Sequence, residues 1–235
     1  MKKTLGPFGL IFLILCFCLI LGACENGDLP IDSSVVLACY GDSLTAGTSA
    51  TRVGQVDKEN AYPAFLQKKV RIKVENFGIS GDTAGQALAR IDDVLAVNPR
   101  IVIIELGAND FLSGISLATT LNNLDAIITM LSDGQRKIYL AKFYTDEVVR
   151  AYLRFMNFFG DTDPAEKKAQ YDNIFSTLAS RHDVELIEDI WTGVWGTEHM
   201  SPFDRIHPRA SGYKIMADKY FEALRPYLAA NNYIR

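Results

Sequence analysis

The chain has 235 residues, four cysteines and a formal net charge of −4 at pH 7, and 49% of its residues are hydrophobic. This length suits a single domain with a substantial core, and it leaves little room for two. The acidic balance, with no block of basic residues, argues against nucleic acid as a partner.

The first 23 residues have the organisation of a secretory signal peptide. Two lysines precede an uncharged apolar run from about Phe8 to Leu21, and two small residues then lead to Cys24. The run is shorter than the roughly 20 apolar residues that span a bilayer, and small residues stand where a peptidase cuts. We therefore expect residues 1–23 to be removed.

The segment from Leu21 to Cys24 resembles the bacterial lipobox, in which the cysteine is acylated through sulfur and becomes the new first residue. A lipid on Cys24 predicts a protein anchored in the bacterial cell envelope, on the periplasmic face of a membrane. Glu25 is no obvious inner-membrane retention signal, which favours the outer membrane. An ordinary signal peptide cut nearby, or an uncleaved anchor helix, is the alternative. Residues 24–34 then form a tether, and residues 35–235 form the domain.

Cys39 has no partner for an internal disulfide bond. Cys16 and Cys18 would leave with the signal peptide, and lipid would block Cys24. Cys39 lies in an apolar run, where a small buried residue fits best, so we interpret it as part of the core.

Apolar runs of strand length alternate with helical patterns through residues 35–235. The predicted strands are Val35–Tyr40, Lys73–Phe77, Ile101–Leu106, Lys137–Ala141 and Val184–Ile187. The predicted helices are Tyr62–Val70, Ala84–Val97, Leu117–Leu131, Pro164–Arg181 and Ala210–Leu228. This alternation predicts a three-layer α/β/α fold whose parallel sheet is covered on both faces. Right-handed crossovers favour a flavodoxin-like sheet of five strands in the order 2-1-3-4-5.

Two long irregular stretches follow the last two predicted strands, and long loops of this kind are typically functional. They are residues 143–163 and 188–209. The first is rich in aromatic residues, which either shape an acyl site or pack against the domain.

In open parallel sheets, ligands bind beyond the carboxyl ends of the strands, and four polar segments fall at such places. The first is Gly41-Asp42-Ser43-Leu44, where a sharp turn at Gly41 would leave the Ser43 hydroxyl pointing out of the sheet. Taken alone, this segment is equally typical of a turn or a helix cap.

Two further segments supply candidate hydrogen-bond donors. Gly81, after the second strand, can present a bare backbone N–H to a substrate, while Asp82 or Thr83 would cap the next helix. Asn109, after the third strand, offers two uncharged amide donors that suit a developing oxyanion, although loop asparagines often only stabilise left-handed turns.

The fourth segment, Asp204-Arg205-Ile206-His207-Pro208, precedes the final helix. The spacing lets the Asp204 carboxylate reach Nδ1 of His207 while Nε2 faces outward, which is how a general base is oriented. A metal site is the competing interpretation, but the chain has only three histidines. We interpret His182 and His199 as surface or packing residues, which leaves no second imidazole ligand for a metal. No cofactor is expected.

Together the four segments resemble those of the SGNH/GDSL hydrolase family. Residues 41–44 match its first block, Gly81 its second, Asn109 its third, and Asp204 with His207 its last. Within the family, the segments NFGISGDTAG, IELGAND and DRIHP are most similar to the bacterial periplasmic thioesterase/lysophospholipase and arylesterase branch.

The resemblance implies a serine esterase that works through an acyl-enzyme on Ser43, with His207 as base and Asp204 orienting it. Ser43, Gly81 and Asn109 would form the oxyanion hole. Small esters, thioesters or lysolipids would be the substrates, and the protein is expected to be a monomer. An acyltransferase or a carbohydrate O-acetyl esterase acting on envelope glycans remains an alternative, as does a non-catalytic envelope protein, although no site residue is missing.

Overall fold

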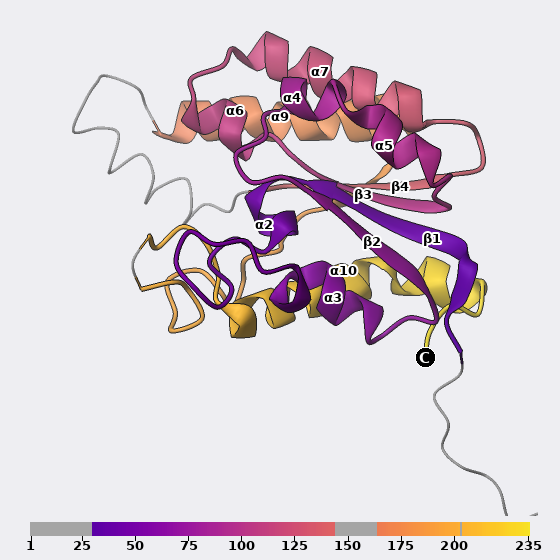
Figure 1. Cartoon of the computed structure of the whole chain (residues 1–235). Coiled ribbons are helices and arrows are strands. Elements are labelled where there is room, and N and C mark those ends of the chain that lie inside the picture. The colour runs from indigo at the N-terminus through magenta and orange to yellow at the C-terminus, as the bar shows by residue number, and fades with distance from the viewer. Residues whose placement is uncertain (1–29, 144–163, 203) are drawn as a thin grey trace, which may run out of the picture. The chain divides into compact units, whose positions relative to one another are not determined.

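A five-stranded parallel sheet forms the centre of the domain (Figure 1). The computed structural model describes residues 30–143, 164–202 and 204–235. The strands are β1 (Asp32–Gly41), β2 (Ile72–Gly78), β3 (Ile101–Glu105), β4 (Lys137–Ala141) and β5 (Glu185–Ile187). They pair in the order β2-β1-β3-β4-β5, and each of these pairings is parallel. The predicted fold class and strand order are confirmed.

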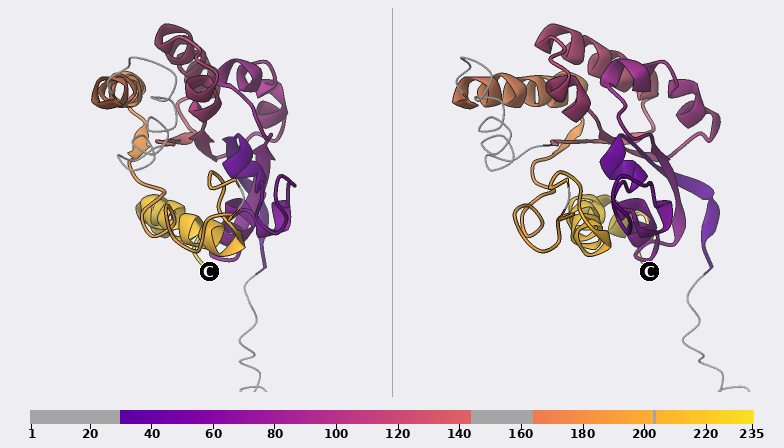
Figure 2. Two further views of the ribbon diagram at one scale, coloured as in Figure 1. Left: turned by 90° about the vertical axis from the view of Figure 1, so that its left-hand side faces the viewer. Right: turned by 60° about the vertical axis from the view of Figure 1, so that its left-hand side comes forward.

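Helices cover both faces of the sheet, which gives the three predicted layers (Figures 1 and 2). One face is covered by α4 (Ala84–Leu88), α5 (Ile91–Ala96), α7 (Leu117–Leu131) and α9 (Pro164–His182). The other face is covered by α3 (Tyr62–Gln67) and α10 (Ala210–Ala230). Three short elements lie in the connections after β1 and β3: α2 (Ser43–Ala46), the 3-10 helix η1 (Lys58–Asn60) and α6 (Ala108–Leu112).

Alternate residues of β1 serve two separate cores. Leu37 and Cys39 belong to the core shared with α3 and α10, whereas Ala38 and Tyr40 belong to the core shared with α4, α7 and α9. Cys39 is fully buried and free, and burial raises the pKa of its thiol, in keeping with a core residue. β3 is buried at every position, which explains why its sequence shows no polar alternation.

The prediction of one helix over Ala84–Val97 is wrong. The structure has two helices there, α4 and α5, which are separated by Ala89 and Arg90. At the break, the Arg90 guanidinium donates to the carbonyl oxygens of Phe77, at 2.9 Å, and Gly41, at 3.1 Å. Both short helices bury apolar residues against the same core, so the hydrophobic period continues across the break and does not reveal it.

Several predicted segments lie outside the described residues: the signal peptide, Cys24, and residues 144–163 of the aromatic stretch. β1 begins at Asp32, which pairs with Ile72, so the sheet starts before the predicted position Val35. Within the described residues, no helix has the length and apolar character to cross a membrane.

The carboxyl ends of β1, β2 and β3 meet at one edge of the sheet. Gly41 is in register with Gly78 of β2 on one side and with Glu105 of β3 on the other. The segments that continue from these three residues therefore start side by side, and they carry three of the four predicted site segments.

Candidate active site

Ser43 is the first residue of α2, immediately beyond the carboxyl end of β1. Asp42 is the N-cap of this short helix, and its carboxylate accepts a backbone N–H of the first turn at 3.1 Å. A Cβ at Gly41 would lie 2.0 Å from Thr45 Oγ1 and 2.7 Å from the carbonyl oxygen of Glu105. Glycine is therefore required at position 41 by close packing beneath the serine, and not by a positive φ angle.

The structure brings together the three residues predicted to form a catalytic triad. Ser43 Oγ lies 2.9 Å from His207 Nε2, although 164 residues separate them in sequence. His207 Nδ1 lies 3.1 Å from Asp204 Oδ2. Because a carboxylate only accepts hydrogen bonds, Nδ1 carries the proton of neutral His207, and Nε2 is free to accept from the Ser43 hydroxyl.

Asp204 is held by more than the histidine. Its Oδ1 accepts the backbone N–H groups of Ile206 and His207, each at 3.0 Å, and its Oδ2 accepts the Ser49 hydroxyl at 2.7 Å. Partial burial acts to raise the pKa of Asp204, but these hydrogen bonds outweigh it and lower the pKa to about 2. Asp204 is therefore a fixed negative charge beside the imidazole at any pH where the protein would work.

Gly81 has the backbone geometry expected of an unobstructed donor. Its φ angle is +88°, a left-handed conformation that favours glycine, and no atom lies within 4 Å of the position where a Cβ would stand. The space beside its backbone is therefore open to a ligand. The cap of the following helix is Thr83, which forms a capping box with Gln86.

Asn109 reaches the same edge of the sheet from the first turn of α6. Its Nδ2 donates to Asp42 Oδ2 at 3.1 Å and to the carbonyl oxygen of Asp82 at 2.9 Å. Both amide hydrogens are thus engaged when no substrate is present. An oxyanion must replace one of these acceptors, and the backbone carbonyl of Asp82 is the uncharged one.

Arg90 connects the first and second site segments, and sequence reasoning did not single it out. Its Nε donates to the Asp82 carboxylate at 2.6 Å, its other nitrogens donate to Phe77 and Gly41, and its guanidinium lies over the Tyr40 ring at 4.8 Å. Ser49 was missed as well. Neither residue belongs to a recognised motif, and the contacts that join them to Gly41 and Asp204 span 49 and 155 residues.

The other two histidines form hydrogen bonds with residues outside the triad. His182 on α9 contacts Asp125 at 2.9 Å, and His199 Nδ1 lies 2.9 Å from the Ser211 hydroxyl. No cluster of three or more His, Cys, Asp or Glu side chains suited to a metal ion occurs within residues 30–143, 164–202 and 204–235.

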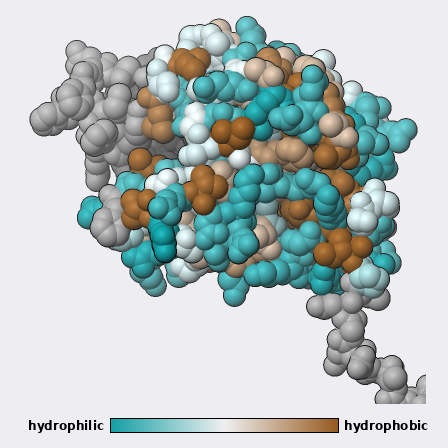
Figure 3. Space-filling view, viewed as in Figure 1, coloured by the Kyte–Doolittle hydropathy of each residue, from teal (hydrophilic) through white to brown (hydrophobic). Residues whose placement is uncertain are grey.

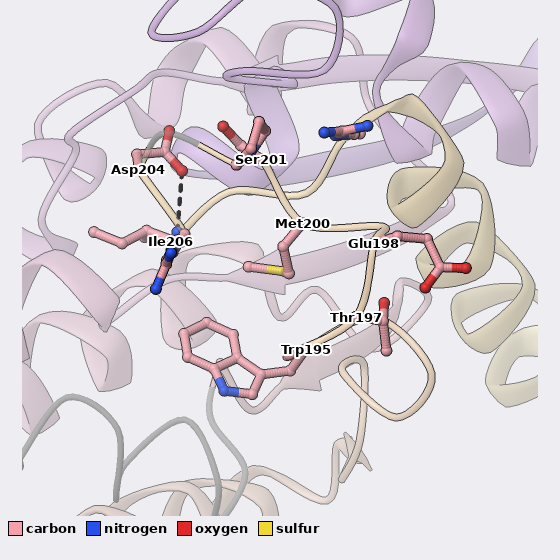
Figure 4. A pocket seen from close by; sticks show the side chains of 11 residues that line it. Trp195, Thr197, Glu198, Met200, Ser201, Asp204 and Ile206 are labelled. Carbon is pink, nitrogen blue, oxygen red and sulfur yellow. Dashed lines mark hydrogen bonds between the residues drawn. The ribbon is translucent and has the colours of Figure 1, made fainter.

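A cavity of about 800 Å³ adjoins the loop that carries Asp204 (Figure 4). Trp195 and Met200 point into it, and the Asp204 carboxylate at its margin accepts the Ile206 N–H drawn there. Three exposed aliphatic side chains, Ile79, Leu112 and Ile206, lie on the segments that bear the candidate site residues. On the face seen in Figure 3, apolar residues form small separate groups among polar ones.

Comparisons with known proteins agree with this architecture. The model of the GDSL-like Lipase/Acylhydrolase family matches residues 39–215. Esterase TesA of Pseudomonas aeruginosa is 26% identical over 203 residues, covering 82% of this chain and 89% of that protein. Thioesterase 1/protease 1/lysophospholipase L1 of Escherichia coli (strain K12) is 30% identical over 197 residues, covering 81% and 83%.

Two solved structures give the same result. A crystal structure of TesA has a TM-score of 0.66 at 26% identity, covering 81% of this chain and 98% of that chain. AlinE4, described as an SGNH-hydrolase family esterase, has a TM-score of 0.59 at 27% identity, covering 86% and 98%.

A serine, a histidine and an aspartate joined by hydrogen bonds at the carboxyl edge of a parallel sheet define a serine hydrolase. The chain belongs to the GDSL-like Lipase/Acylhydrolase family and is an ester-hydrolysing serine hydrolase. The resemblance to the SGNH/GDSL family and to its thioesterase and arylesterase branch is confirmed.

Proposed function

We propose that the protein hydrolyses carboxylic esters and thioesters of apolar acyl chains through an acyl-enzyme on Ser43. The observation that carries this proposal is the line of hydrogen bonds from Ser43 through His207 to Asp204. His207 takes the hydroxyl proton as Ser43 Oγ attacks the carbonyl carbon, and it gives that proton to the departing alcohol or thiol. Water then attacks the acyl group, its proton passes through His207 to Ser43, and the acid is released.

Negative charge on the tetrahedral intermediate would be met by the backbone N–H groups of Ser43 and Gly81 and by the Asn109 amide. The open space at Gly81 supports its role. Asn109 would exchange its bond to the Asp82 carbonyl for one to the oxyanion and keep its bond to Asp42. Donors placed in advance around a developing charge are usually the largest single contribution to catalysis.

The side chains around the site favour a substrate with an apolar acyl or aryl group. The neighbouring cavity is lined by Trp195, Met200 and Ile206, with Arg205 and Arg209 also in its wall. The names of two relatives, Arylesterase of Vibrio mimicus and the E. coli thioesterase and lysophospholipase, point to the same kinds of substrate.

A substrate panel tests the proposal directly. Protein lacking residues 1–24 would be assayed with p-nitrophenyl esters of increasing chain length, acyl-thioesters, lysophospholipids and acetylated sugars, with Ser43→Ala as the blank. Hydrolysis of the apolar esters and thioesters is expected. Activity confined to acetylated sugars, or acyl transfer to an added glycan acceptor in place of hydrolysis, would contradict it.

The pH dependence of kcat/KM should show an acid limb, because His207 must be neutral to act as base. Asp204 cannot produce this limb, since its pKa of about 2 leaves it ionised throughout. Activity should therefore rise as pH rises through the limb. Initial rates in buffers of constant ionic strength measure it, and a flat profile would argue against a histidine base.

We further propose that the protein is exported and held in the bacterial cell envelope by lipid on Cys24, on the periplasmic face of a membrane and by preference the outer one. The support is the small-residue segment that ends the apolar run, directly before the cysteine. Two acyl chains make such anchoring stable, because each buried methylene contributes about 0.8 kcal/mol.

Cys24→Ala should release the protein from the membrane fraction without loss of esterase activity. Fractionation of the producing cells and mass spectrometry of the N-terminal peptide measure this, and Cys39→Ala serves as the matched control that should stay membrane-bound. A native protein found only in soluble fractions, with no lipid mass on Cys24, would show the lipobox interpretation to be wrong.

A further inference from the structure

Directly beneath the nucleophile lies a carboxyl group that ester hydrolysis itself does not use. Glu105 ends β3 and is fully buried, and Asp42, beside it at the end of β1, is 1% exposed. Among the described residues, no lysine, arginine or histidine forms an ion pair with either carboxyl group. Two buried carboxyl groups without a cation are expensive to ionise together.

The surroundings of this pair offer no compensating charge. The titratable groups that face it are Cys39 of β1, Tyr62 of α3, Tyr213 and Tyr220 of α10, and Asp82 with its partner Arg90. Arg90 is already committed to Asp82 and to two carbonyl oxygens. Burial, and then the charge of Asp42, raise the pKa of Glu105 well above its usual value.

The hydrogen bonds of Glu105 show where a proton belongs. Its Oε2 accepts the Thr45 hydroxyl at 3.1 Å, and Thr45 Oγ1 lies 3.2 Å from the Tyr62 hydroxyl. Its Oε1 is buried without a partner, yet the carboxyl groups of Glu105 and Asp42 are within hydrogen-bonding reach. Two carboxylates cannot bond to each other, because both only accept. A proton on Oε1 gives that oxygen a partner and gives Asp42 a third donor.

Asp42 is the member of the pair that is equipped to be ionised. It accepts the Leu44 N–H at 3.1 Å and the Asn109 amide at 3.1 Å. Burial raises the pKa of Asp42, while hydrogen bonds from Leu44 and Glu105 act to lower it. Asp42 accepts from two donors and Glu105 from one, so the negative charge is better placed on Asp42 and the proton stays on Glu105.

We propose that Glu105 is a positioning residue: it remains protonated, donates to Asp42, and so fixes the carboxylate that orients the Asn109 amide toward the oxyanion. Asn109 can give one amide hydrogen to the intermediate only if Asp42 keeps the other in place. A neutral Glu105 also limits the floor of the site to one negative charge. This inference rests on the proposed role of Asn109 in ester hydrolysis.

Two substitutions of Glu105 separate the effect of its hydrogen-bond donor from the effect of its side-chain volume. Glu105→Gln keeps a neutral group that can donate to Asp42 and accept from Thr45, so kcat should stay within about threefold of wild type. Glu105→Leu fills a similar volume but cannot donate, and kcat should fall roughly 10- to 100-fold with little change in KM, because the group acts on the transition state. Rates are expressed per active site, titrated with an organophosphonate, so that misfolded protein does not count. Equal losses in both variants would overturn the proposal.

A double-mutant cycle with Asn109→Ala tests whether Glu105 acts through the amide. If it does, Glu105→Leu should cost almost nothing further once Asn109 has been removed. A purely structural role would instead lower kcat or stability by the same factor in both backgrounds, and additive losses would therefore contradict the proposal.

Infrared spectroscopy provides a readout that does not depend on the leucine variant folding. Wild type at neutral pH should show the carbonyl band of a buried protonated carboxylic acid, and Glu105→Gln should lack it. A wild-type spectrum without this band would overturn the proposal. Failure of the proposed function would look different: wild type would not hydrolyse esters, or the organophosphonate would not label Ser43.

Discussion

Replacing Ser43 with alanine is expected to lower kcat/KM for ester hydrolysis by several orders of magnitude and to leave the fold intact. The change removes one oxygen, whose partner is His207 Nε2 at 2.9 Å. Alanine is well tolerated in the first turn of α2, because it is the best helix former. Steady-state rates with p-nitrophenyl esters measure the loss of activity. Circular dichroism and thermal unfolding show whether the fold is intact. Wild type treated with an organophosphonate should carry the label on Ser43 alone.

A second serine, histidine and carboxylate in the same chain supply a matched control. Ser211 Oγ lies 2.9 Å from His199 Nδ1, and His199 Nε2 lies 4.0 Å from Glu198 Oε1. The residue types are those of a triad, but the Glu198 side chain is 85% exposed, and Ser211 lies in the first turn of α10, which does not directly follow a strand. Ser211→Ala should leave kcat/KM unchanged. A label on Ser211, or a loss with Ser211→Ala equal to that with Ser43→Ala, would refute the assignment of the nucleophile.

The fold could be predicted because its strands bury both faces. β3 consists of apolar residues up to its last residue, Glu105. A short apolar run of this length is typical of a strand that is buried on both faces. The helix Pro164–His182 also agrees with its predicted range to within one residue. The break between α4 and α5 could not be predicted, because the hydrophobic period continues across it and the hydrogen bonds of Arg90 to β1 and β2 depend on the assembled sheet.

The same distinction applies to the site. The contact between Asp204 and His207 is local, so a spacing of three residues was sufficient to predict it. Ser49 reaches Asp204 across 155 residues, and Glu105 reaches Thr45 across 60. No motif in the sequence marks these two contacts, unlike the contact between Ser43 and His207 across 164 residues. The residues that touch substrate follow from motifs, whereas the residues that hold them in place follow only from the assembled sheet.

Asn109→Ala is expected to reduce kcat roughly 10²- to 10³-fold, or about 2.7 to 4 kcal/mol, the usual penalty for removing one oxyanion donor. KM should change little, because the amide contributes more to the transition state than to the ground state. In the resting site both amide hydrogens already have acceptors, Asp42 and the carbonyl of Asp82. The substitution therefore also removes two ground-state hydrogen bonds, and a modest fall in Tm should accompany the kinetic loss. Stability alone cannot explain the result, because kcat is measured per titrated active site.

Asn98→Ala provides the matched control for a loop asparagine. Asn98 has a φ of +44° and its side chain accepts from Arg136, in the connection that precedes β3, at the opposite edge of the sheet from Ser43. Its loss should lower Tm but not kcat.

Asn109→Asp should lower kcat more than Asn109→Ala does. A second carboxylate would face Asp42 at about the distance of the present 3.1 Å bond, and it would repel the developing oxyanion. If Asn109→Ala keeps wild-type kcat in a folded protein, the amide serves only to join Asp42 to Asp82. Stabilisation of the intermediate would then fall to the backbone N–H groups of Ser43 and Gly81.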